Sequence, residues 1–326
     1  MTNMTRAQLI NSWISSKYCF LVIVFLAIGM LFSNFFGSLR FMVSALLALN
    51  MFSLALNCRL SEFRQIGRLS SKIVLILLVI YGLVPLFALA LGKVALPNEP
   101  GLAAGLVLIS ILPAAMTSAF WTEETNGNLA LTFSMIIMTT ILSGILIPSL
   151  MNLYVGKTIE FNASGLLTGL IKTVVLPVLI GLAVRHYFDT PTQIVKPYLD
   201  VCVKISMLVV ISINAAVIIP YVQDLRWELL AVVIAILIHI LGSYAVGYCS
   251  AYLAFPHNPE MRISIAYATG MRNNSAGIAI ALAYFPPLVA VPVILSILFQ
   301  QPIAAITRTI IDRRREASHF ASMRAN

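Results

Sequence analysis

Residues 268–277 read Ala-Thr-Gly-Met-Arg-Asn-Asn-Ser-Ala-Gly, a polar stretch inside a segment that is otherwise apolar enough to cross a membrane. An arginine at the centre of a membrane helix costs about 2.5–3.5 kcal/mol to insert, so one is rarely placed there without a function. The run of polar residues after Gly270 predicts a helix that opens its backbone at bilayer depth. Open backbone is tolerated there only where it is buried in protein or lines a water-filled cavity. The stretch therefore points to the movement of a solute.

The composition indicates that most of the chain lies in a membrane. Of the 326 residues, 60% are hydrophobic and 10% are charged, whereas a soluble domain carries about 25% charged residues. The net charge of +9 is explained by lysines and arginines that fix membrane orientation, so we expect no nucleic-acid partner. No His or Cys residues stand at metal-ligand spacing, and we expect neither a metal site nor a cofactor.

Apolar runs separated by polar or Gly/Pro clusters predict an all-α membrane protein with ten transmembrane helices. The expected spans are 18–36, 40–57, 71–92, 100–124, 127–150, 163–185, 194–221, 228–254, 260–285 and 288–310. Residues 1–17 form a short cytoplasmic amino terminus and residues 311–326 a basic cytoplasmic tail.

The distribution of positive charge predicts the orientation of these helices. Of the 21 lysines and arginines, four fall in outside loops when the amino terminus is placed in the cytoplasm. Three more fall within helices (Lys172, Lys204 and Arg272), and the remaining fourteen lie on the cytoplasmic side. This strong positive-inside bias predicts a multi-pass protein of the cell membrane, of the bacterial inner-membrane type, with both termini cytoplasmic.

Two of the ten segments are predicted to be interrupted, at Pro113 in the fourth and at Gly270 in the ninth. Each is the fourth helix in a set of five, and because five is odd the second set enters the membrane from the opposite side. This pattern is typical of inverted-topology repeats, here 18–150 and 151–310, with a binding site where the discontinuous helices cross. The N-termini of the half-helices and Arg272 make that crossing electropositive, which suits a carboxylate. Proline kinks also occur in membrane helices that bind nothing.

At these two motifs the chain resembles the bile acid:sodium symporter family, whose superfamily also holds arsenite efflux permeases. Family members commonly read Pro-Gly-Gly-x-x-Ser-Asn and then Gly-Asn-x-Ala-Leu-Ser across helices four and five. This chain reads Pro-Ala-Ala-Met-Thr-Ser-Ala at 113–119 and Gly-Asn-Leu-Ala-Leu-Thr at 127–132, with the same spacing. The resemblance implies a secondary transporter in which a bundle with the crossed helices rocks against a panel of helices one, two, six and seven.

The resemblance also implies sodium sites, and here the chain departs from the family. The family's helix nine reads Glu-x-Gly-x-Gln-Asn, and its glutamate and glutamine hold sodium together with the Ser-Asn of helix four and hydroxyls of helix five. This chain has Ala268, Arg272 and Ala119 at three of those positions. The donors that remain in kind, a possible residual ion site, are Ser118, Thr132 and Asn273. A sodium ion needs hard oxygen donors and a negative charge to offset its desolvation, so we expect sodium dependence to be weakened or absent, with Arg272 supplying the positive charge.

The sequence therefore predicts a secondary active transporter that moves a small organic anion by alternating access, with this solute and the lipid bilayer as its partners. The residues expected to line the substrate site are Thr117, Ser118, Arg272, Asn273, Asn274 and Ser275. Two alternatives remain open, a sodium-coupled symporter of bile acid-like anions and a non-transporting receptor or scaffold of the same fold. An enzyme is not expected, because the helices hold no embedded acid pair and no Ser/His dyad. The oligomeric state is left open.

Other polar residues within helices are weaker candidates. Histidine as a residue type titrates near neutrality, so His239, midway along the eighth helix, is a possible proton relay in place of sodium; a hydrogen-bonded structural histidine is the alternative. Gln300 and Gln301 interrupt the tenth helix just before Pro302. They fit contacts at the crossing and ordinary interhelical hydrogen bonds equally well.

Overall fold

The fold was obtained as a computed structural model, which describes residues 9–11, 13–14, 17–57, 70–222 and 227–325. Within these ranges every regular element is a helix, as predicted. In chain order the elements are α2 (Tyr18–Leu31), α3 (Ser33–Ser38), η1 (Leu39–Met42), α4 (Val43–Ala55), α6 (Ser70–Ala95), α7 (Pro100–Ile111), α8 (Thr117–Glu124), α9 (Leu129–Val155), α10 (Ala163–Leu170), η3 (Ile171–Val175), α11 (Leu176–Tyr187), α12 (Asp189–Val222), α13 (Trp227–Ala254), α14 (Pro259–Gly270), α15 (Asn274–Tyr284), η4 (Pro287–Val289) and α16 (Ala290–Ala325).

Seven helical stretches in the described part of the chain are long and apolar enough to cross a membrane. They are Ser33–Ala55, Ser71–Ala95, Leu129–Val155, Ala163–Tyr187, Ile194–Val217, Trp227–Ala254 and Pro287–Ile311. Three shorter apolar helices, Phe20–Leu31, Pro100–Ile111 and Asn274–Tyr284, fall in the other three predicted segments. The last two are halves of interrupted helices, which explains why neither reaches the roughly 20 residues of a full crossing. The chain is a multi-pass membrane protein, and the ten-helix inverted repeat remains a prediction.

The ends of some predicted segments differ from the structure. The first segment, predicted at 18–36, is divided between α2 and α3 at Phe32. At the other end, α16 continues as a helix through most of the predicted tail, because Ala, Arg and Glu are good helix formers. The predicted amino-terminal segment 1–17 falls largely outside the described residues.

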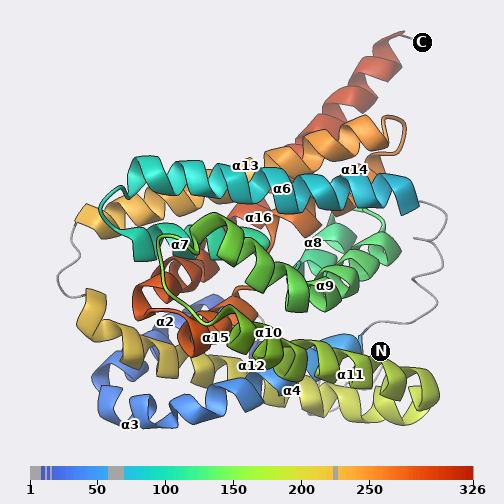
Figure 1. The fold of residues 1–326 in the computed structure, drawn as a ribbon. Coiled ribbons are helices and arrows are strands. Elements are labelled where there is room, and N and C mark those ends of the chain that lie inside the picture. Colours follow the sequence, from blue (N-terminus) through green and yellow to red (C-terminus); the bar gives the residue numbers. More distant parts are fainter. Residues whose placement is uncertain (1–8, 12, 15–16, 58–69, 223–226, 326) are drawn as a thin grey trace.

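The helices form two groups that face each other across the molecule (Figure 1). One group, here called the panel, contains α2, α3, η1, α4, α10, η3, α11 and α12, in which α2 packs on α12 and α4 on α11. The other, here called the core bundle, contains α6 to α9 and α13 to α16, in which α6 packs on α7 and α13 on α14. In the chain order of the ten segments, the panel corresponds to the first, second, sixth and seventh.

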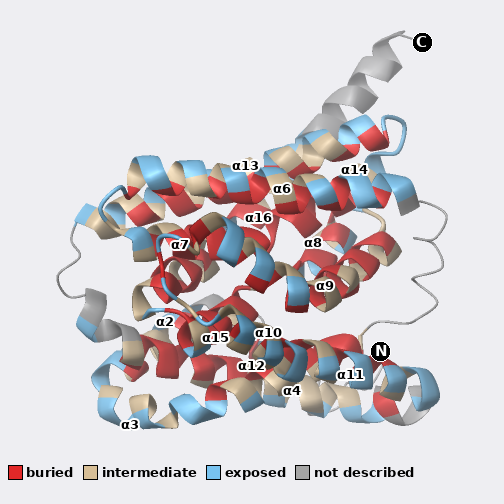
Figure 2. Cartoon of the chain, in the orientation of Figure 1, coloured by how far each residue is buried: buried red, intermediate tan, exposed pale blue. Residues whose placement is uncertain are grey.

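Buried residues gather inside the core bundle and where it meets the panel, whereas α3, α6 and α13 carry many exposed residues (Figure 2). Many of the exposed residues are large and apolar, such as Leu78, Leu86, Leu241 and Leu253. An exposed apolar belt of this kind suits contact with lipid, since bilayer tails replace water around it.

Candidate functional site

The two interruptions lie side by side and are held together by their own backbones. α7 ends at Ile111 and α8 begins at Thr117, while α14 ends at Gly270 and α15 begins at Asn274. Ala115 donates its backbone N–H to the Met271 carbonyl (3.0 Å), and Asn273 donates to the Pro113 carbonyl (2.9 Å). Residues 114 and 272 thus form an isolated antiparallel bridge. A polar backbone group left unpaired at membrane depth costs several kcal/mol, so this pairing is what permits both helices to open there.

The start of α15 is also fixed by side-chain capping. Asn273 is the N-cap of this helix, and its side-chain oxygen accepts from the Ala276 N–H (3.1 Å). In the other interruption, between α7 and α8, the Ala114 N–H donates to Thr139 Oγ1 of α9 (3.1 Å). The helices α8 and α15 therefore both begin at this crossing, and the N-terminus of each carries a partial positive charge.

Arg272 lies inside this crossing and is almost fully buried, with 2% of its surface exposed. Its guanidinium donates through Nη1 to the Leu112 carbonyl, at the C-terminal end of α7 (3.0 Å). The guanidinium carbon lies 6.0 Å from the ring centre of Tyr81 on α6, a cation–π distance. Nε and Nη2 have no hydrogen-bond partner among the described residues. The guanidinium thus points into the protein, beside the Leu112 carbonyl at the negative end of a half-helix.

Two adjacent amides of α16 hold the broken helices in place. Gln300 Oε1 accepts from the backbone N–H of Arg272 and from Asn274 Nδ2, both at 3.0 Å. Gln301 Oε1 accepts from the indole N–H of Trp121 on α8 (2.8 Å). Gln300 therefore makes a crossing contact, one of the two possibilities that the sequence left open, whereas Gln301 binds further along α8.

The six predicted substrate residues differ in exposure. Thr117 is exposed, and Asn273 and Ser275 are half-buried. Ser118, Arg272 and Asn274 are buried, and the Ser118 hydroxyl donates to the Ala115 carbonyl (2.6 Å). The structure brings all six to the same two helix starts.

The three predicted residual ion ligands each have another partner. The Ser118 hydroxyl is bonded as above, and Asn273 caps α15. Thr132 Oγ1 donates to Thr122 Oγ1 of α8 (3.1 Å) and lies 3.2 Å from the Asn128 carbonyl.

The two alanines at positions where the resemblance implies sodium ligands lie in an apolar environment. Ala119 is 4% exposed and Ala268 1% exposed, and both belong to one hydrophobic cluster with Leu131, Met135 and Ile136 of α9. Aliphatic side chains at this junction offer a cation no oxygen ligands.

His239 is buried on α13, with its ring stacked on Phe87 of α6 at a centroid distance of 6.4 Å. Neither ring nitrogen has a hydrogen-bond partner in the described part of the chain. The predicted proton role of His239 therefore remains a prediction.

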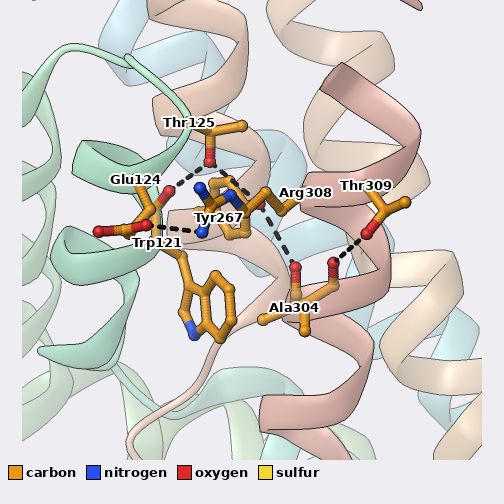
Figure 3. Close-up of polar contacts among 8 residues, drawn as sticks. Trp121, Glu124, Thr125, Tyr267, Ala304, Arg308 and Thr309 are labelled. Carbon is orange, nitrogen blue, oxygen red and sulfur yellow. Dashed lines mark hydrogen bonds and ion pairs between the residues drawn. The ribbon is translucent and has the colours of Figure 1, made fainter. Parts of the chain in front are cut away.

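A second polar cluster ties α8 to α14 and α16 at the predicted cytoplasmic end (Figure 3). Arg308 of α16 pairs with Glu124 at the end of α8, with 2.6 Å between Nη1 and Oε2. Thr125 donates to the Tyr267 hydroxyl (3.2 Å), which in turn lies 3.4 Å from the Ala304 carbonyl. The helix that carries Gln300 and Gln301 thus also contacts the C-terminal end of α8, through Arg308.

Comparison with known proteins agrees with this geometry. A sequence model of the "Sodium Bile acid symporter family" matches residues 44–225, which include the first interruption. The chain is 29% identical over 287 residues to an uncharacterized protein of Bacillus subtilis strain 168, YbaS, covering 88% of this chain and 94% of that protein. It is 27% identical over 273 residues to the "Uncharacterized sodium-dependent transporter YocS" of the same organism, covering 83% of each. A "Probable sodium/metabolite cotransporter" of Arabidopsis thaliana chloroplasts is 26% identical over 246 residues, which cover 72% of this chain and 60% of the plant protein.

Proposed function

This chain belongs to the sodium bile acid symporter family, and from that premise we propose that it carries a small organic anion across the membrane by alternating access. The proposal includes ten helices in two inverted repeats and cytoplasmic termini. The substrate site lies at the starts of α8 and α15. Thr117 offers an exposed polar group and Asn273 and Ser275 half-buried ones, whereas Ser118 and Asn274 are buried.

The observation that carries the anionic preference is the buried guanidinium of Arg272 beside two helix N-termini. Each N-terminus contributes roughly half a positive charge, and Arg272 contributes a full one. The guanidinium is bonded to the Leu112 carbonyl, so it acts on the ligand mainly through its charge from within the protein. An anion that binds at the crossing balances this charge, and a cation is repelled by it.

The same arginine supports sodium-independent binding. Arg272 replaces the glutamine, and Ala119 and Ala268 replace the asparagine and glutamate, of the family pattern. The two alanines pack in an apolar cluster, where a desolvated sodium ion lacks the oxygen ligands that it needs. We propose that the tethered guanidinium takes the place of the bound ion.

A sodium-coupled symporter is the second candidate. The names of YocS from Bacillus subtilis and of the relative from Arabidopsis thaliana mention sodium. The hydroxyls of Ser118 and Thr132 and the side chain of Asn273 are the remaining donors for a residual site. For this candidate, sodium must increase ligand affinity or flux.

Movement between the panel and the core bundle supplies the alternating access. Contacts between the two groups occur near the predicted outer ends of α4, α10 and α15. Arg40 of η1 donates to the Leu282 carbonyl, and Tyr284 lies against Gly169. The ring of the loop residue Phe161 is tilted against that of Phe285, with 4.8 Å between the ring centroids. A cavity of about 400 Å³ beside Arg40 and Leu282 lies at this same junction. These contacts support a state that is closed on the outer side, and transport requires them to break.

A thermal-stability screen of the purified protein against small carboxylates, with sodium or with potassium, tests the proposal. A ligand at 100 times its Kd stabilises the folded state by about 2.7 kcal/mol, which a melting experiment resolves. We expect carboxylates to stabilise the protein equally in both salts. Stabilisation that needs sodium supports the second candidate, and no stabilisation by any carboxylate overturns the anionic preference. The Arg272→Ala variant distinguishes a transporter from a scaffold of the same fold. A transporter loses substrate flux into vesicles, whereas the properties of a scaffold are nearly unchanged by the substitution.

A further inference from the structure

The side-chain amide of Asn274 is held in one orientation by its neighbours. Gln300 accepts a hydrogen bond from the backbone N–H of Arg272 at 3.0 Å. A backbone N–H can only donate, so the atom of Gln300 that meets it must be the carbonyl oxygen Oε1. The same oxygen lies 3.0 Å from the Asn274 amide. Asn274 must therefore present its NH₂ group, because its own oxygen would repel Oε1. The usual ambiguity between the two ends of an amide is removed by this anchor.

One consequence is that the oxygen of Asn274 remains without a partner. Asn274 is only 3% exposed, and its Oδ1 accepts no hydrogen bond from any described residue. A buried acceptor left unpaired costs about 1–3 kcal/mol. The residue is the first of α15, and its neighbours Asn273 and Ser275 are half-buried at the crossing. The unpaired oxygen therefore lies at the helix start to which the proposed function assigns the anion.

We propose that the transported anion also carries a hydrogen-bond donor, which pairs with Asn274 Oδ1, and that Gln300 is the positioning residue for this contact. The inference rests on the proposed anion site. On the substrate, the donor lies close to the anionic group. Asn274 Oδ1 binds the donor and the N-terminus of α15 binds the anionic group, and Asn274 is the first residue of that helix. A hydroxyl fits better than an ammonium group, since the charge of Arg272 two residues away repels a second cation. The substrate class is a small 2- or 3-hydroxy carboxylate.

Binding of a matched series of four-carbon acids to the purified full-length protein tests this proposal. The probes are butanoate, 2-hydroxybutanoate, 3-hydroxybutanoate, 2-oxobutanoate and 2-aminobutanoate, measured by calorimetry at one ionic strength. We expect one of the hydroxy acids to bind roughly 5- to 150-fold tighter than butanoate, which leaves the acceptor unpaired. The oxo acid places an acceptor against an acceptor and should bind no better than butanoate.

Variants of the two adjacent amides show whether Gln300 sets the preference. Gln300→Met removes the acceptor at similar length, so Asn274 is free to turn and the ratio of hydroxy to oxo affinity should fall towards one. Gln300→Glu keeps acceptor oxygens and should retain the ratio. Gln301→Met is the matched control, because it removes the Trp121 contact on the same helix and should leave the ratio unchanged.

The outcomes separate this inference from the proposed function. If butanoate and the oxo acid bind as tightly as the hydroxy acids, a water molecule satisfies Oδ1 and the donor inference is overturned while the anion site stands. If none of the five acids binds, both fail. An unchanged ratio in Gln300→Met overturns the positioning role alone.

Discussion

Replacing Arg272 by glutamine removes the charged side chain that lies at the crossing and restores the residue type that the family pattern has there. The variant keeps a polar side chain at a position that is 2% exposed, but it loses the charged bond to the Leu112 carbonyl. We expect the affinity for small carboxylates to fall, because the helix N-termini alone then attract the anion.

The size of this effect follows from the position of the arginine. Asn273 and Asn274 are one and two residues from Arg272, so their Cα atoms lie within about 8 Å of its Cα, and we take about 8 Å as the separation between the charge and a ligand that they hold. At an effective dielectric constant of about 20, a unit charge at about 8 Å contributes about 2 kcal/mol. That energy corresponds to a roughly 30-fold weaker affinity for Arg272→Gln.

Calorimetric titration of carboxylates in sodium-free buffer measures the change. Lys172→Gln is the matched control, since Lys172 is also a cation within a predicted membrane helix but lies on η3 in the panel. The control has the same change in net charge and should bind as the unmodified protein does. Equal affinity in Arg272→Gln and in the unmodified protein would refute the electrostatic role. An equal loss in both variants would show that only the overall charge matters.

Three further outcomes are expected. Flux of the anion into vesicles should be unchanged when sodium is replaced by potassium at constant ionic strength, and a several-fold fall would favour the sodium-coupled candidate. Gly270→Ala places a methyl group against the ring of Tyr244, so the protein should lose about 1–3 kcal/mol of stability and melt at a lower temperature, whereas an unchanged melting temperature contradicts this packing. Arg308→Gln breaks the pair with Glu124, but both side chains are more than a third exposed, so the loss should stay below about 1 kcal/mol and flux should change little; a large loss of flux would mean that the cytoplasmic end of α8 controls transport.

The features that follow from local sequence could be predicted. Apolar segments of about 20 residues require helices, so the all-helical membrane fold follows from the chain itself. Pro113 indicated the first interruption, but a proline alone does not decide it, because Pro85 and Pro148 lie inside the continuous helices α6 and α9. The second interruption was indicated by Gly270 and the polar run at 272–275. The count of crossings is less direct, because interrupted helices leave only short apolar pieces such as Pro100–Ile111.

The contacts between distant segments could not be predicted from one sequence. The bond from Arg272 to the Leu112 carbonyl joins residues 160 positions apart, and the Trp121–Gln301 bond joins residues 180 apart. No periodicity encodes such pairs. Gln300 and Gln301 were visible as polar residues in an apolar helix, but only the fold shows which of them reaches the crossing. Tyr81 gave no signal at all, since an aromatic residue in a membrane helix is ordinary.

A positive charge that is fixed in the protein and a bound sodium ion differ in how they affect the driving force of transport. A sodium ion that crosses the membrane with the substrate couples transport to the sodium gradient. Arg272 is covalently part of the chain, so its charge is present in both the outward-facing and the inward-facing state. It can raise affinity, but it cannot supply a driving force. Without another coupled ion, net flux follows the anion's concentration gradient and the membrane potential, which is worth about 2.3 kcal/mol per charge for each 100 mV. A potential that is negative inside favours the exit of a monovalent anion by roughly 50-fold at 100 mV. Sodium independence and the direction of flux are therefore one physical question, because a protein that binds its anion without sodium and still accumulates it must exchange it for another solute or move a proton with it.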